Sequence, residues 1–104
     1  MAARHLDLLP ESMGICRLES GRPIPAWATK AGFFSITGTS EELSVVCPEA
    51  SIPGGVVCSR QWRLFRVKGP LDFSETGVLA SLAGPLGRAG ISIFVVSTYD
   101  TDML

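Results

Sequence analysis

The chain has 104 residues, of which 46% are hydrophobic and 18% are charged. This length suits one compact domain, or two small lobes that share a core, and the composition excludes a disordered chain. Nine Lys or Arg residues against ten Asp or Glu residues leave a net charge of −1. That balance is not the basic footprint of a nucleic-acid-binding protein, so no nucleic-acid partner is predicted.

Targeting and membrane signals are not evident in the sequence. The longest apolar run, 91–96, is interrupted by Ser92 and is far shorter than the roughly 18 residues that cross a bilayer. Arg4, His5 and Asp7 stand where a secretory signal needs apolar residues. The sequence therefore predicts a cytoplasmic protein with no membrane partner.

The chemistry-bearing residues do not predict an enzyme. The three cysteines, Cys16, Cys47 and Cys58, are odd in number and lack C-x-x-C spacing, so we expect reduced thiols. Cys16 and Cys47 fall in strand-like segments, where cysteine is usually a small buried residue. The single histidine, His5, lies near the N-terminus, and no phosphate-binding glycine motif occurs. We expect neither catalysis nor a metal or cofactor.

The start of the chain predicts one strand and a short helical turn. Residues 6–18 form an extended segment that ends at the turn signal Ser20-Gly21-Arg22-Pro23. Residues 24–28 suit only a brief helical turn, because Pro25 is tolerated at a helix start but the stretch is too short to continue.

A hairpin follows. Residues 33–37 and 43–47 predict two strands, and the connection 38–42 contains the glycine and polar residues that hairpin turns prefer. Residues 48–55 contain two prolines and two glycines, which indicates a loop or a linker between two halves of the protein.

The second half predicts a strand at 62–68, which Gly69-Pro70 ends, and then a helix. Either Asp72 or Ser74 is the N-cap of this helix. Its apolar stripe has helical spacing and consists of Val78, Leu79, Leu82 and Leu86. Pro85 predicts a kink or an early end, since proline removes one internal hydrogen bond.

Residues 91–98 give the strongest strand prediction. Both of its faces are apolar, which is typical of a central strand. Strand, helix and strand between Trp62 and Thr98 form a right-handed crossover unit, and together with the hairpin they predict an α+β protein.

Three segments, taken together, resemble the small tandem-ACT proteins of bacteria, relatives of the animal cytosolic arginine sensors. The segments are Phe33–Thr37 with Glu42–Val46, Gly69–Leu79 and Ile91–Asp102. The resemblance extends over most of residues 12–104.

The resemblance implies a ferredoxin-like ACT fold of βαββαβ type with two ACT-like halves. We expect residues 1–55 and 60–104 to be these halves, packed as one unit. Family members continue with a further strand, helix and strand, so the second half is expected to be incomplete at Leu104. The third strand of such a half lies between its first two. Its loss would leave a gap that a partner chain could fill.

The resemblance also implies an amino-acid ligand held between ACT units, and hence a homodimer or higher homo-oligomer. Glu75 and Gly77 match a glutamate and a glycine of the sensors' ligand loop, and Asp102 matches an aspartate of their site. The predicted ligand-binding residues are Asp72, Phe73, Ser74, Glu75, Thr76, Gly77, Val78, Ser97, Thr98 and Asp102. Three of these, Asp72, Ser74 and Thr76, differ from the sensor pattern, so the sequence leaves the identity of the ligand open.

The residue types suit this ligand. N–H groups at a helix start attract a carboxylate, Gly77 permits close approach, and Glu75 or Asp102 can bind an ammonium group. The same residues suit an ordinary helix cap, and Ser97–Asp102 suits a polar turn. The predicted function is thus a regulatory amino-acid sensor. The alternative is a ligand-free dimerisation or interaction module of ferredoxin-like fold.

Overall fold

The computed structural model describes residues 6–67, 84–93, 95–97 and 102–103. The architecture is α+β, with antiparallel strands and few helices. The chain divides into two compact units, Pro10–Leu64 and Met1–Leu9 with Phe65–Leu104. In the part of the chain described, no helix has the length and apolar character needed to span a membrane.

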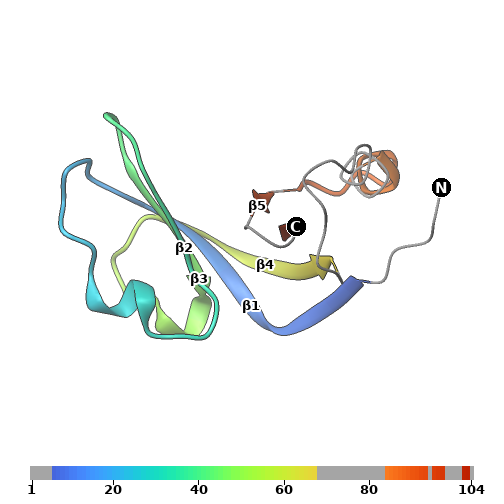
Figure 1. Cartoon of the computed structure of the whole chain (residues 1–104), viewed down its shortest axis with the longest axis horizontal. Coiled ribbons are helices and arrows are strands. Elements are labelled where there is room, and N and C mark those ends of the chain that lie inside the picture. The colour runs from blue at the N-terminus through green and yellow to red at the C-terminus, as the bar shows by residue number, and fades with distance from the viewer. Residues whose placement is uncertain (1–5, 68–83, 94, 98–101, 104) are drawn as a thin grey trace. The chain divides into compact units, whose positions relative to one another are not determined.

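Four strands contribute to the unit Pro10–Leu64. They are β1 (Leu6–Leu18), β2 (Ser35–Gly38), β3 (Leu43–Pro48) and β4 (Cys58–Val67), in the hydrogen-bonded order β2-β3-β1-β4 (Figure 1). The predicted hairpin is confirmed, because β2 pairs antiparallel with β3. Its turn is closed by Thr39, whose Oγ1 accepts hydrogen bonds from the N–H groups of Glu41 and Glu42 at 3.1 and 3.0 Å.

The other elements of this unit follow the sequence with shifted boundaries. β1 has the predicted bounds and leads to a turn in which Gly21 has a φ of +74°. The predicted helical turn is the 3-10 helix η1 (Ala26–Thr29). A second 3-10 helix, η2 (Glu49–Ser51), lies in the segment expected to be a loop, and β4 begins four residues before the predicted start.

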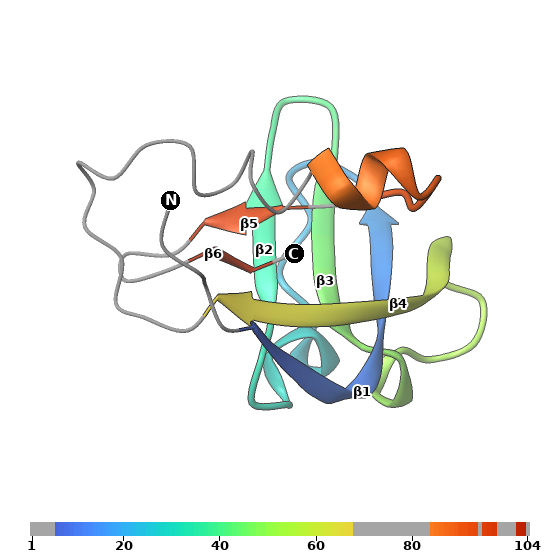
Figure 2. The ribbon, with the colours of Figure 1, turned by 90° about the vertical axis from the view of Figure 1, so that its right-hand side faces the viewer.

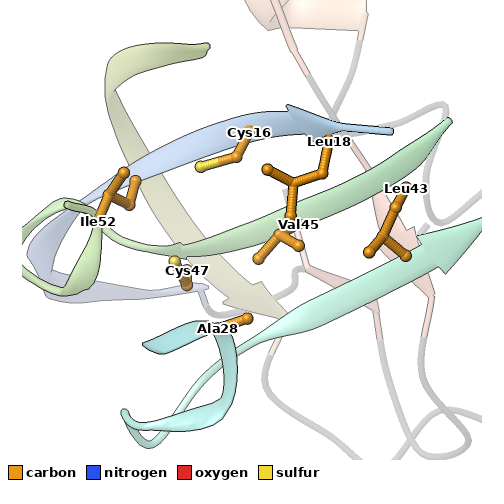
Figure 3. Close-up of a cluster of buried hydrophobic side chains, with 7 residues drawn as sticks. All are labelled: Cys16, Leu18, Ala28, Leu43, Val45, Cys47 and Ile52. Carbon is orange, nitrogen blue, oxygen red and sulfur yellow. The ribbon is translucent and has the colours of Figure 1, made fainter. Parts of the chain in front are cut away.

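A cluster of buried side chains holds this unit together. Alternation along paired strands puts the inward residues of β1 and β3 on one face. Val45 and Ala28 are both 0% exposed, so the small side chain of Ala28 lets η1 approach the sheet closely. Full burial of a Val or Leu side chain contributes about 1.5–3 kcal/mol. The cluster consists of Cys16, Leu18, Ala28, Leu43, Val45, Cys47 and Ile52 (Figure 3).

The unit that contains the C-terminus includes the end of β4 and the short strands β5 (Val96–Ser97) and β6 (Asp102–Met103), in the order β4-β6-β5 (Figure 2). The prediction of a long central strand at 91–98 is wrong. Residues 91–93 are not strand, Ile91 is 52% exposed, and β5 ends the strand order of the described residues. A run of apolar residues does not by itself form a strand, because the backbone N–H and C=O groups of a strand need hydrogen-bond partners on a neighbouring strand.

Helical residues at 84–88 include Pro85 and continue past it, so the helix does not end there, which was one of the two predicted outcomes. The other, a kink, involves residues before Gly84 that lie outside the described ones. Proline lacks an N–H group but keeps its carbonyl, which accepts a hydrogen bond from the Ala89 N–H at 3.0 Å. The helix ends in a Schellman motif. The Ile91 N–H donates to the Leu86 carbonyl, and the N–H of Gly90 donates to Gly87 with φ of Gly90 at +76°.

Gly90→Ala tests this helix end. A left-handed conformation costs a non-glycine residue about 1–2 kcal/mol, so we expect the free energy of unfolding to fall by that amount. Gly87→Ala is the matched control, because Gly87 is helical and has open space where a Cβ would lie. This control is expected to stabilise the protein by about 0.5–1 kcal/mol. Urea denaturation followed by circular dichroism measures both; equal effects would contradict the motif.

Candidate functional site

The residues predicted from the sequence to bind a ligand fall in two groups. Ser97 and Asp102 lie in β5 and β6, and their backbone positions are described. The others lie outside the described residues: Asp72, Phe73, Ser74, Glu75, Thr76, Gly77, Val78 and Thr98.

The pairing of β5 with β6 brings two predicted site residues together. The strands run antiparallel, with Val96 opposite Met103 and Ser97 opposite Asp102. Cα atoms of such partners are about 4.5–5.5 Å apart. The backbone positions of Ser97 and Asp102 are therefore neighbours, as a shared site requires.

β6 also pairs antiparallel with β4, through Arg66 and Met103. Since both neighbours are antiparallel to β6, β4 and β5 run parallel to each other. β4 ends one residue after Arg66, at Val67, while β6 begins at Asp102 and β5 ends at Ser97. The chain therefore leaves β4 at the sheet edge where Ser97 and Asp102 meet.

The position of β6 corrects one expectation. A gap was expected between the first two strands of the second half, but β6 occupies the place between β4 and β5. Met103 is 5% exposed, so even this two-residue strand contributes a side chain to the core. The reason is that Asp102 and Met103 pair with strands on both sides, which local apolar patterning does not reveal.

Arg66, the residue of β4 that pairs with Met103, has an anionic partner. Its Nη2 lies 3.1 Å from Oδ2 of Asp7 in β1, with the two side chains 52% and 34% exposed. Pairs this exposed contribute about 0.2–1 kcal/mol. The Arg66 guanidinium is therefore paired with a carboxylate, but this ion pair adds little to the free energy of unfolding.

A separate depression of about 540 Å³ lies on the unit Pro10–Leu64, and the sequence analysis missed it. It is lined by Arg17, Leu18, Glu19, Ser20, Glu41 and Val57. One guanidinium and two carboxylates can serve a small zwitterion, because Arg suits carboxylates and Glu suits ammonium groups. The sequence could have indicated this depression in one way. Alternation along β1 places Arg17 on the exposed face, close to Glu19 in the turn that follows.

Among the residues that the structure describes, no group of three or more His, Cys, Asp or Glu side chains is arranged to hold a metal ion.

Comparison with known proteins identifies the family. A family model described as an ACT domain matches residues 57–104, and a model described as an N-terminal domain matches residues 11–55. The crystal structure of protein Atu0741 from Agrobacterium tumefaciens is similar over 99% of this chain and 77% of that chain. It has a TM-score of 0.91 and 46% sequence identity. The chain belongs to the family of small ACT-domain proteins that includes this Agrobacterium protein.

The family is related to animal arginine sensors. The proteins named cytosolic arginine sensor for mTORC1 subunit 1 from Homo sapiens and Bos taurus are each 48% identical to this chain over 42 residues. The mouse protein is 45% identical over the same length. Each match covers 39% of this chain and 13% of the sensor, so the chain corresponds to a small part of these relatives.

Met103→Ala tests whether β6 is anchored as described. Replacing a buried methionine with alanine leaves a cavity, and we expect a loss of about 2–5 kcal/mol in the free energy of unfolding. Met103→Leu is the control, because it keeps the volume and should cost less than about 1.5 kcal/mol. Guanidinium denaturation measures both, and an alanine variant as stable as the leucine variant would show that Met103 is not packed.

Proposed function

We propose that this protein is a non-catalytic regulatory module that binds a free amino acid. Its membership in the ACT-domain family and its relation to proteins named as arginine sensors support this role. The single observation that carries the proposal is the sheet edge where β4 ends, Ser97 faces Asp102, and β6 begins.

The proposed site consists of the segment after β4 together with the ends of β5 and β6. Its residues are Asp72, Phe73, Ser74, Glu75, Thr76, Gly77, Val78, Ser97, Thr98 and Asp102. Support comes from strand direction: the parallel strands β4 and β5 end at the same edge of the sheet, and the antiparallel strand β6 starts there. Residues that follow β4 need only a short path to reach Ser97 and Asp102.

The two charged groups of the amino acid would bind to different partners in the protein. Backbone N–H groups near Ser74 and Gly77 would donate to the carboxylate, as they do at helix starts. Asp102 or Glu75 would accept hydrogen bonds from the ammonium group or from a basic side chain. Hydrogen bonds to charged groups contribute about 1.5–3 kcal/mol each. Micromolar affinity corresponds to a net binding free energy of about 8 kcal/mol, so these bonds together must exceed the cost of immobilising the ligand by that amount.

The proposal extends to the organisation of the chain. We propose that residues 1–55 and 60–104 are two ACT-like halves packed as one unit, and the two family matches at 11–55 and 57–104 support this division. We also propose a cytoplasmic homodimer or higher homo-oligomer that holds its ligand between ACT units. The competing function is a ligand-free dimerisation module.

A thermal-shift screen of the common amino acids tests the proposal. A ligand that binds only the folded state at ten times its Kd stabilises it by about 1.4 kcal/mol. For a chain of this size, that raises Tm by about 5–10 °C. We expect one amino acid, with free arginine the first to test, to produce such a shift at millimolar concentration. If none does, the ligand-free dimerisation module is the better description.

Charge-removing variants locate the site. Asp102→Asn and Glu75→Gln are expected to abolish the ligand-induced shift, because each replaces the carboxylate that would bind the ammonium group with a neutral amide of the same size; the unliganded Tm should stay within about 4 °C. Glu11→Gln, on an exposed residue of β1, is the control that keeps the shift. Arg17→Gln tests the depression on the unit Pro10–Leu64. A shift lost in Arg17→Gln but kept in Asp102→Asn would move the ligand to that depression.

A further inference from the structure

Three thiols meet at the core of the unit Pro10–Leu64. Cys16 and Cys47, in β1 and β3, are each 1% exposed and belong to the buried cluster (Figure 3). Cys58, at the start of β4, is half-buried and packs against the same cluster. One cysteine is therefore accessible from solvent, and the two others lie behind it.

The strand contacts place Cys16 opposite Cys58. A Cβ built on Gly14 would lie 3.6 Å from the Ser59 carbonyl oxygen, and the Arg17 N–H donates to the Val57 carbonyl at 2.9 Å. Gly14 is thus near Ser59, and Arg17 is hydrogen-bonded to Val57. Residue numbers rise along one segment as they fall along the other, so the two segments run antiparallel. Cys16 then lies opposite Cys58, and both Cys58 and Cys47 are close enough to influence the pKa of the Cys16 thiol.

Cys47 is less well placed for a bond to Cys16. The residue of β3 directly opposite Cys16 is Val45, so Cys47 is its diagonal neighbour. Diagonal Cα atoms are about 7–8 Å apart, whereas opposite ones on adjacent strands are about 4.5–5.5 Å apart. A disulfide spans about 4.4–6.8 Å between Cα atoms. Geometry therefore favours a bond to Cys58 over one to Cys47.

The buried thiols are also chemically distinct from Cys58. Burial, together with the neighbouring thiols of Cys47 and Cys58, raises the pKa of Cys16 to about 12. Burial likewise raises the pKa of Cys47. Since the thiolate is the form that attacks an oxidant, both buried thiols stay protonated near neutral pH and are poor targets for an oxidant from solvent. An oxidant from solvent should therefore attack Cys58 first.

We propose that Cys58 and Cys16 form a reversible disulfide when the protein meets hydrogen peroxide. In the first step the Cys58 thiolate attacks one peroxide oxygen. An S–O bond forms and the O–O bond breaks; the hydroxide that leaves takes up the proton that Cys58 released and becomes water, and Cys58 is left as a sulfenic acid. In the second step the Cys16 sulfur loses its proton and attacks the Cys58 sulfur. The S–S bond forms, the S–O bond breaks, and the hydroxyl group leaves with that proton as a second water. A dithiol reductant reverses the bond by thiol–disulfide exchange.

Peptide mapping of the peroxide-treated full chain tests this assignment. Remaining thiols are blocked with N-ethylmaleimide in denaturant, and trypsin then releases residues 5–17, with Cys16, and residues 31–60, with Cys47 and Cys58. Cleavage after Glu49 separates the last two cysteines. We expect a Cys16–Cys58 bond, loss of two thiols of three, and full recovery with dithiothreitol.

Variants decide between the two buried thiols. Cys47→Ala is expected to keep the disulfide and Cys58→Ser to abolish it. In Cys16→Ala, Cys58 should remain as a sulfenic acid that dimedone traps. Circular dichroism melting checks that each variant folds; if Cys16→Ala does not, the mapping of the unsubstituted chain and of Cys47→Ala still decides. A Cys47 disulfide, or three thiols that survive peroxide in the unsubstituted chain, would overturn the proposal.

Discussion

The arrangement of the C-terminal unit depends on a two-residue strand that pairs on both sides. Met103 in β6 lies opposite Arg66 of β4 and opposite Val96 of β5. This double pairing makes β4 and β5 parallel, since each is antiparallel to the strand between them. It also collects the end of β4, the end of β5 and the start of β6 at one edge of the sheet. The proposed amino-acid site exists only if that edge is assembled.

The unit Pro10–Leu64 is organised by different chemistry. Small side chains and branched aliphatic ones fill its core, and Ala28 allows the 3-10 helix η1 to pack closely. Cys16 and Cys47 serve here as compact apolar residues, which agrees with the burial that raises the pKa of both. The same packing brings Cys58 against them. A core built for close packing thereby places an accessible thiol opposite a buried one.

Particular elements show where sequence reasoning succeeds. β1 and the hairpin of β2 and β3 were predictable because alternation, a glycine turn and a polar connection all favour the same local structure. Residues 91–98 show where it fails, because both faces are apolar, yet among the residues described in this range only Val96–Ser97 is strand. Pro85 was expected to kink or end its helix, but helical residues continue to Arg88, and the positive φ of Gly90 closes the Schellman motif. The chemical types of the candidate ligand residues were available from the sequence; the apposition of Ser97 and Asp102 was not.

The sequence by itself determined the α+β class, the ACT resemblance, the strands of the first half and the residue types suited to a zwitterion. These follow from composition and from patterns that extend over a few neighbouring residues. Only the tertiary structure decided that β6 lies between β4 and β5, that Arg66 pairs with Asp7, and that Cys16 faces Cys58. The physical reason is that strand partners are chosen by hydrogen bonds and packing between residues far apart in the chain. Local periodicity does not encode that choice.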